Sequence, residues 1–118
     1  MKEFLLLIRT EGDYCAEMPA EQYQQHLQKV SNYIAELIQQ GKFKSAQPLH
    51  MEGMMLQGNK AVFKDGPFIE SKEVIIGYFL ILAKDINEAR EIAMANPIFE
   101  ETDARIEIRL IKHEEGIS

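Results

Sequence analysis

The chain has 118 residues, 46% of them hydrophobic and 27% charged, and 19 acidic against 13 basic side chains give a formal net charge of −6. This length fits one domain with a single core, and the composition is that of a globular protein rather than a disordered one. The charge and the lack of a Lys/Arg cluster argue against nucleic acid and anionic membranes as partners, and no apolar run approaches the length of a membrane span.

The first half of the chain predicts a strand, a helix and a second strand. Phe4–Ile8 is a short apolar run typical of a strand. A helix is expected to begin at Pro19 and to end before Gly41, a natural left-handed stop. Lys44–Met51 predicts the next strand, and Pro48 within it favours an edge position. The apolar side chains of the helix recur every three or four residues, at Tyr23, Leu27, Val30, Ile34, Leu37 and Ile38.

The middle of the chain predicts a β-hairpin. Met54–Gln57 and Lys60–Lys64 flank Gly58-Asn59, a pair that suits a tight two-residue turn. Asp65-Gly66-Pro67 then predicts a break in the chain, since all three residues favour turns. We interpret this hairpin as an insertion between two elements of the main fold.

The last third of the chain predicts a strand, a helix and a strand. Val74–Ala83 is rich in β-branched and aromatic residues and predicts a strand. Asp85, with Glu88 three residues later, is a capping-box signature for a helix that ends near Asn96-Pro97. Arg105–Ile111 alternates apolar and charged residues, as does a strand with one buried face.

The order of these elements is that of the ferredoxin-like split βαβ fold, an α+β class, with an inserted hairpin and a single domain over residues 1–118. In this fold the first and third main strands are central, and two helices cover one face of the sheet. Both Phe4–Ile8 and Val74–Leu82 are apolar on two faces, so something else must cover the second face. We expect an identical subunit to do so, and the rival hypothesis is a large apolar ligand or another protein.

A string of residues after the hairpin resembles a known family. Asp65-Gly66-Pro67-Phe68, then Glu70-Ser71-Lys72-Glu73 and Gly77-Tyr78, resemble the DGPF branch of the YCII-related family, and the resemblance extends over the whole chain. It implies a dimeric α+β barrel but no single activity. Members of the wider family resemble muconolactone isomerase-like proteins, which use the cavity between sheet and helices. Some DGPF relatives are associated with extracytoplasmic sigma factors, so a regulatory role stays open.

The resemblance also points to one candidate catalytic pair. In the YCII-related pattern a histidine on the first helix faces an aspartate near the end of the second helix. The histidine matches His26, but the second position is Asn96. An asparagine can hydrogen-bond an imidazole but cannot stabilise its charged form by charge attraction. The pair is therefore open to three interpretations: packing residues, a ligand-orienting pair, or an acid/base with His26 as the acid/base and Asn96 as its orienting partner.

The DGPF string has a structural and a ligand-binding interpretation. Asp65 and the Gly-Pro pair form turns, and Phe68 can plug the core beside them. Alternatively, the side chains of this region line a ligand pocket, with Lys72 as the anion contact. The candidate ligand contacts are Asp65, Phe68, Ser71, Lys72 and Tyr78.

Metal and cofactor chemistry has little support in the sequence. His26, His50, His113 and Cys15 lack the short spacings of a zinc site, and no Gly-rich phosphate cradle is present. Cys15 as a nucleophile would need a nearby base. As the single cysteine it excludes an internal disulfide framework, and it favours a cytoplasmic location. We expect no metal and no cofactor.

These observations favour a cytoplasmic homodimer that binds a small organic molecule in a cavity between its sheet and helices. Whether the protein is an enzyme stays open. An enzyme of this kind would be a cofactor-independent isomerase or lyase, with His26 as acid/base and Tyr78 or Lys72 assisting. The alternative is a non-catalytic regulatory module that recognises another protein, such as a sigma factor.

Overall fold

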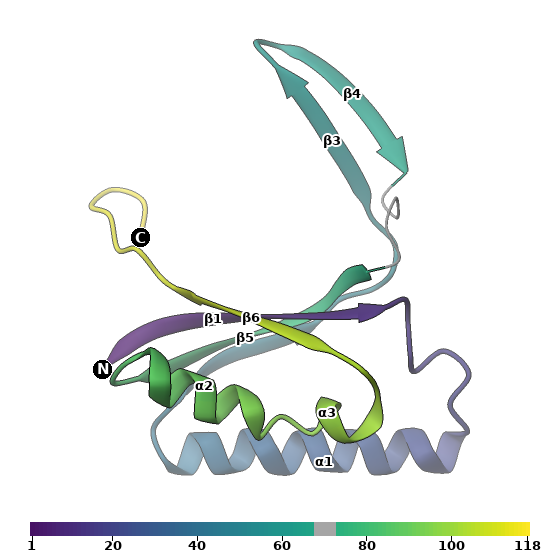
Figure 1. Ribbon diagram of the computed structural model, residues 1–118, viewed down its shortest axis with the longest axis vertical. Coiled ribbons are helices and arrows are strands. Elements are labelled where there is room, and N and C mark those ends of the chain that lie inside the picture. Colours follow the sequence, from purple (N-terminus) through teal and green to yellow (C-terminus); the bar gives the residue numbers. More distant parts are fainter. Residues whose placement is uncertain (68–72) are drawn as a thin grey trace.

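The computed structural model describes residues 1–67 and 73–118 of the chain. It has a mixed α+β architecture with a four-stranded antiparallel sheet and a separate hairpin (Figure 1). Within the described residues, no helix is long and apolar enough to cross a membrane. The elements in chain order are β1 (Lys2–Glu11), α1 (Ala20–Gln39), β2 (Phe43–Pro48), β3 (Met54–Asn59), β4 (Val62–Pro67), β5 (Glu73–Ala83), α2 (Ile86–Met94), α3 (Ile98–Glu101) and β6 (Arg105–Leu110).

The main sheet has the predicted ferredoxin-like order, β2-β5-β1-β6. β1 pairs with both β5 and β6, so the two strands with apolar residues on both faces are the central ones, as expected. β2, which ends at Pro48, lies at an edge, where the missing proline N–H costs no sheet hydrogen bond. The helices all lie on one side of this sheet (Figure 1).

The core fills the space between the sheet and the helices. Alternation along β1 turns Phe4, Leu6 and Ile8 toward the helices, and β5 contributes Phe79 and Ile81 to the same face. The helices complete the core with Tyr33 and Leu37 of α1, Ala89, Ile92 and Ala93 of α2, and Ile98 of α3.

The helix ends follow the capping rules that the sequence indicated. The Asp85 side chain accepts a hydrogen bond from the Glu88 backbone N–H at 2.9 Å, and the Glu88 carboxylate accepts one from the Lys84 N–H at 3.0 Å. The predicted capping box is therefore confirmed. Gly41 has a φ of 72°, the left-handed conformation expected just after a helix. α1 itself begins at Ala20, with Pro19 as its N-cap rather than its first residue.

The second face of the sheet carries an apolar centre that no helix covers, which we call the open face. The pairing of β1 with β5 places Leu5 beside Leu80 and Leu7 beside Tyr78 on this face. Charged pairs surround the apolar centre. The Arg9 guanidinium contacts Glu107 at 2.9 Å along β6, and the Lys44 ammonium contacts Glu3 at 2.6 Å.

The hairpin differs from its prediction by two residues. β3 runs to Asn59 and β4 starts at Val62, so the turn falls on Lys60-Ala61, both with positive φ (51° and 67°). Gly58 lies inside β3 opposite Phe63, where an added Cβ would come within 2.6 Å of the Phe63 ring. The glycine thus serves a close strand contact rather than the turn. The expected break at 65–67 is also wrong, because β4 continues to Pro67.

The β3–β4 hairpin stands away from the rest of the molecule, and we call it the arm. It projects on the side of the sheet opposite the helices (Figure 1). All six residues of β3 are exposed, as are the described side chains of β4. The radius of gyration is 16.3 Å, against about 13.5 Å for a compact domain of this length. The arm is therefore a large apolar surface without a core of its own.

Candidate functional site

A cavity of about 450 Å³ lies between the first half of α1 and the sheet, and we call it the α1 cavity. The loop 13–15 and the segment 46–51 line its sides, while β5 contributes residues 76–79. Most of its wall is apolar. The polar groups of the wall come from Asp13, Tyr14, Cys15, Tyr23, His26, Gln47, His50, Tyr78 and Asn96.

The α1 cavity explains a difference between the predicted and observed faces of α1. Tyr23, Leu27, Val30 and Ile34 were expected to pack on the core, but these side chains line the cavity. Tyr23 and Leu27 are 40% and 42% exposed as a result. Tyr33, outside the predicted stripe, is buried instead. The first half of α1 therefore faces a cavity, and only its second half packs tightly.

His26 forms a buried ion pair with Glu101 of α3. The Nδ1 atom of His26 lies 2.6 Å from an oxygen of Glu101, and the two side chains are only 13% and 10% exposed. The contact is an ion pair when the imidazole is protonated, and its geometry is not that of an aligned hydrogen bond. Neither atom has a hydrogen-bond partner among the described residues.

Tyr14 contacts the other nitrogen of His26. Its hydroxyl lies 3.4 Å from Nε2, and the two rings meet edge to face with centroids 5.7 Å apart. Burial, together with the nearby Cys15, raises the pKa of the Tyr14 phenol above its usual value. Tyr14 therefore keeps its proton and can donate it to Nε2. The Tyr23 ring packs against the same imidazole at 6.0 Å.

Asn96 lines the same cavity as His26, but its described hydrogen bond is local. Its side-chain oxygen accepts a hydrogen bond from the Ile98 backbone N–H at 2.9 Å, and the residue is 5% exposed. The polar contacts of His26 are to Glu101 and Tyr14. The structure thus brings the two predicted residues to one cavity and gives the histidine a different acidic partner.

The remaining predicted ligand contacts fall mostly outside this cavity or outside the described residues. Tyr78 contributes to the cavity wall, but alternation along β5 places its side chain beside Leu7 on the open face. Phe68, Ser71 and Lys72 lie outside the described residues. The backbone of Asp65 lies in β4, opposite Leu56.

Cys15 and the histidines form no metal site in the structure. The described ranges contain no group of three His, Cys, Asp or Glu side chains placed to bind a metal ion. Cys15 is half-buried at the cavity wall, and burial raises the pKa of its thiol. A protonated thiol is a weak nucleophile, which makes Cys15 a poor candidate for covalent chemistry.

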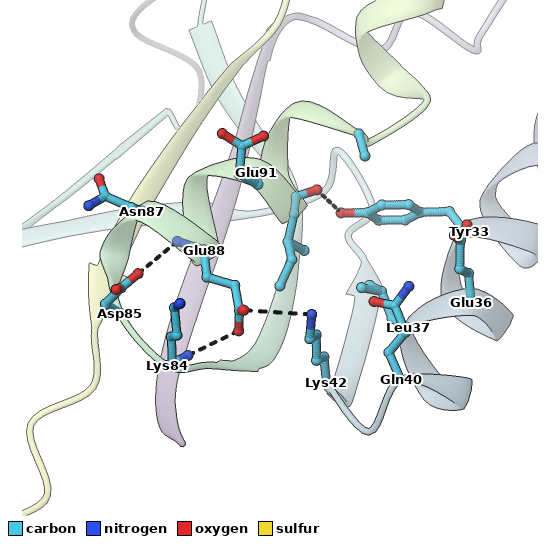
Figure 2. Close-up of a pocket in the computed structure, with 12 residues that line it drawn as sticks. Tyr33, Glu36, Leu37, Gln40, Lys42, Lys84, Asp85, Asn87, Glu88 and Glu91 are labelled. Carbon is cyan, nitrogen blue, oxygen red and sulfur yellow. Dashed lines mark hydrogen bonds and ion pairs between the residues drawn. The ribbon is translucent and has the colours of Figure 1, made fainter.

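A second groove, of about 640 Å³, lies between the end of α1 and the start of α2 (Figure 2). The Tyr33 hydroxyl donates to the Ile92 carbonyl across this groove at 2.5 Å. Glu88 lies between the Lys84 N–H and the Lys42 ammonium, which is 3.7 Å away. Because these polar groups are engaged in capping and helix packing, the groove is a weaker candidate than the α1 cavity.

Sequence reasoning missed the residues that contact His26, namely Glu101 and Tyr14. Glu101 belongs to α3, which has four residues and is too short for a periodic pattern. The sequence nevertheless contains a signal for the start of α3. Proline is common at helix starts, and Pro97 is the N-cap of α3. Tyr14 lies in a loop whose position relative to α1 no local pattern predicts.

Comparison with known proteins identifies the family. No curated protein matches the chain. The family model described as the YCII-related domain matches residues 3–114, nearly the entire chain. This match agrees with the α+β fold and with the resemblance seen in the sequence. The chain therefore belongs to the YCII-related family.

Proposed function

We propose that this protein is a cytoplasmic homodimer of the DGPF branch that binds a small organic molecule in the α1 cavity, with His26 as an acid/base. The observation that carries the proposal is a buried, paired histidine in the wall of a 450 Å³ cavity. This volume lies within the range of about 300 to 1,000 Å³ that is typical of ligand pockets. An apolar wall with a few convergent polar groups is also typical of such sites.

The lining indicates the kind of molecule that fits. No Lys or Arg belongs to the cavity wall in the parts of the chain that the structure describes. The ligand is therefore largely apolar, with a hydroxyl, carbonyl or acidic C–H group directed at His26. Imidazole changes charge near neutral pH, so it suits a proton transfer of the isomerase or lyase type without a cofactor. The ligand contacts expected of Asp65, Phe68, Ser71, Lys72 and Tyr78 stay predictions.

The open face and the arm support the homodimer. An apolar centre with a rim of charged pairs is the usual anatomy of a protein interface. An isolated two-stranded hairpin is marginal in water, yet the arm exposes Met54, Leu56 and Phe63 at 70%, 59% and 64%. Both surfaces lie on the side of the sheet away from the helices (Figure 1). One identical subunit packed sheet to sheet would cover the two together.

The same two surfaces also favour a second candidate function, a non-catalytic module that binds another protein. A sigma factor is one such partner implied by the DGPF resemblance. The two functions differ in which surface is used: the α1 cavity for a small molecule, the open face and arm for a protein. Their tests are therefore separate.

The cavity is tested by screening a fragment library of apolar molecules that each carry one hydroxyl or carbonyl, with NMR shifts as the readout. Hits should shift the His26 signals, and Leu27→Trp, which fills the cavity, should weaken their binding at least tenfold. Ile38→Trp is the matched control, because Ile38 is exposed on the same helix and does not line the cavity. A screen without hits, or hits that ignore Leu27→Trp, would contradict the proposal.

A further inference from the structure

His26 and Glu101 are held together by elements that are distant in the sequence. His26 lies in α1, whereas Glu101 is the last residue of α3. Their side chains are largely buried, and neither of the two contacting atoms has a hydrogen bond among the described residues. A buried carboxylate without such a partner would be costly, so the contact is a specific feature rather than a surface ion pair.

The pairing decides which nitrogen of His26 carries a proton. An ionised carboxylate only accepts hydrogen bonds and the Glu101 oxygen lies 2.6 Å from Nδ1, so we infer that Nδ1 carries the proton. In the neutral ring, Nε2 is then the free acceptor. Its contact with the Tyr14 hydroxyl is 3.4 Å long, beyond the usual range of about 2.7 to 3.2 Å for a hydrogen bond to nitrogen. A ligand donor can therefore replace Tyr14 at Nε2.

Asn96 supports the same arrangement indirectly, through α3 rather than through the imidazole ring. Its side chain accepts the Ile98 N–H and so fixes the turn that starts α3. Glu101 ends that helix and contacts His26. Asn96 thus orders the short helix that carries the carboxylate.

We propose that Glu101 is the positioning carboxylate of His26, holding Nδ1 protonated and Nε2 as the base, and that Asn96 supports it through α3. The catalytic meaning of this arrangement rests on the proposed function. When a ligand O–H or C–H gives up its proton, Nε2 receives it, Nδ1 keeps its own, and the imidazolium is balanced by ionised Glu101. The bond broken is the ligand O–H or C–H bond, and its electron pair stays on the ligand.

The test needs no ligand, so its failure is distinguishable from a failure of the proposed function. The protein is labelled with ¹⁵N-histidine, and the ring nitrogens are recorded at a pH where exposed histidines are neutral. The His26 signals are assigned by their loss in His26→Gln. We expect wild-type His26 to carry a proton on Nδ1. Glu101→Leu should remove that preference, whereas Glu100→Leu, on an exposed neighbour in α3, should leave it intact.

Two results would overturn the inference: a wild-type His26 protonated on Nε2 alone, or a Glu101→Leu spectrum identical to that of the wild type. The wild-type spectrum decides the first question even if Glu101→Leu does not fold. Glu101→Gln supplies a second variant, since it keeps an oxygen acceptor of the same length. It should retain more of the Nδ1–H form than Glu101→Leu.

Discussion

At the scale of single residues, the wall of the α1 cavity holds two side chains that keep their protons, Tyr14 and Cys15, beside the imidazole of His26. Burial raises the pKa of both the Tyr14 phenol and the Cys15 thiol, so the two groups stay protonated near neutral pH. His26, paired through Nδ1 with Glu101, keeps Nε2 available. The environment thus keeps Tyr14 and Cys15 as hydrogen-bond donors, in agreement with the proposed role of His26 as the base.

Cys15 provides a pH test of this environment. Because burial raises the pKa of its thiol, the thiolate forms at higher pH in the folded chain than in the unfolded one. The pH of half-maximal alkylation by iodoacetamide should therefore be higher for the native protein than for the same protein in urea. The midpoint of this profile reports the ionisation and is independent of access. A native midpoint at or below the unfolded one would contradict the assignment.

Tyr33→Phe tests the hydrogen bond between α1 and α2. The Tyr33 hydroxyl donates to the Ile92 carbonyl in a buried contact, but the same carbonyl also accepts the Ala95 N–H at 3.3 Å. The substitution therefore leaves no carbonyl unsatisfied, and we expect a loss of about 0.5–1.5 kcal/mol in the free energy of unfolding, measured in urea. Tyr23→Phe is the control and should cost less, because no described hydrogen bond uses the Tyr23 hydroxyl.

At the scale of elements, the short helix α3 brings Glu101 into contact with His26. The Asn96-Pro97 pair ends α2 and starts α3, and four residues later the chain presents Glu101 to α1. The family pattern pointed to position 96 as the partner of His26. In this chain the acidic group that reaches the imidazole comes from position 101 instead.

Two substitutions at Asn96 test the hydrogen bond by which its side chain supports the start of α3. Asn96→Ala leaves the buried Ile98 N–H without its acceptor, which should cost about 1–3 kcal/mol in the free energy of unfolding. Asn96→Ser keeps a neutral oxygen acceptor there and should cost less. Urea unfolding measures both. Equal losses for the two variants would show that the hydrogen bond to Ile98 does not carry the effect.

The sequence predicted long elements and caps well and short-range pairing less well. The β-branched and aromatic run at Val74–Ala83, the Asp85 capping box and the Gly41 stop are local signals, and the structure confirms all three. The hairpin turn was misplaced because Gly58 serves a close contact across the strands, a requirement of pairing that composition does not show. The His26–Glu101 contact was missed because it joins two elements through the tertiary fold.

At the scale of the whole molecule, the chain has two unequal sides. The helix side holds the core and the α1 cavity, while the other side presents the open face and the arm (Figure 1). The overall dimensions, 47 × 44 × 20 Å, describe a thin and wide molecule rather than a sphere. A second copy against the open face would bury the central leucines, which is the physical reason for expecting a dimer.

Leu80→Glu tests that dimer. Leu80 lies on the open face between Leu5 of β1 and Ser45 of β2, so a carboxylate there is tolerable in a monomer but would be buried and unpaired in a sheet-to-sheet dimer. Light scattering at micromolar concentration should give a dimeric mass for the wild type and a monomeric mass for Leu80→Glu. Met94→Glu, on an exposed apolar residue of α2, is the control and should remain dimeric. A monomeric wild type would reject the homodimer and leave the open face and arm to a different protein, whereas a Leu80→Glu variant that stays dimeric would place the interface elsewhere.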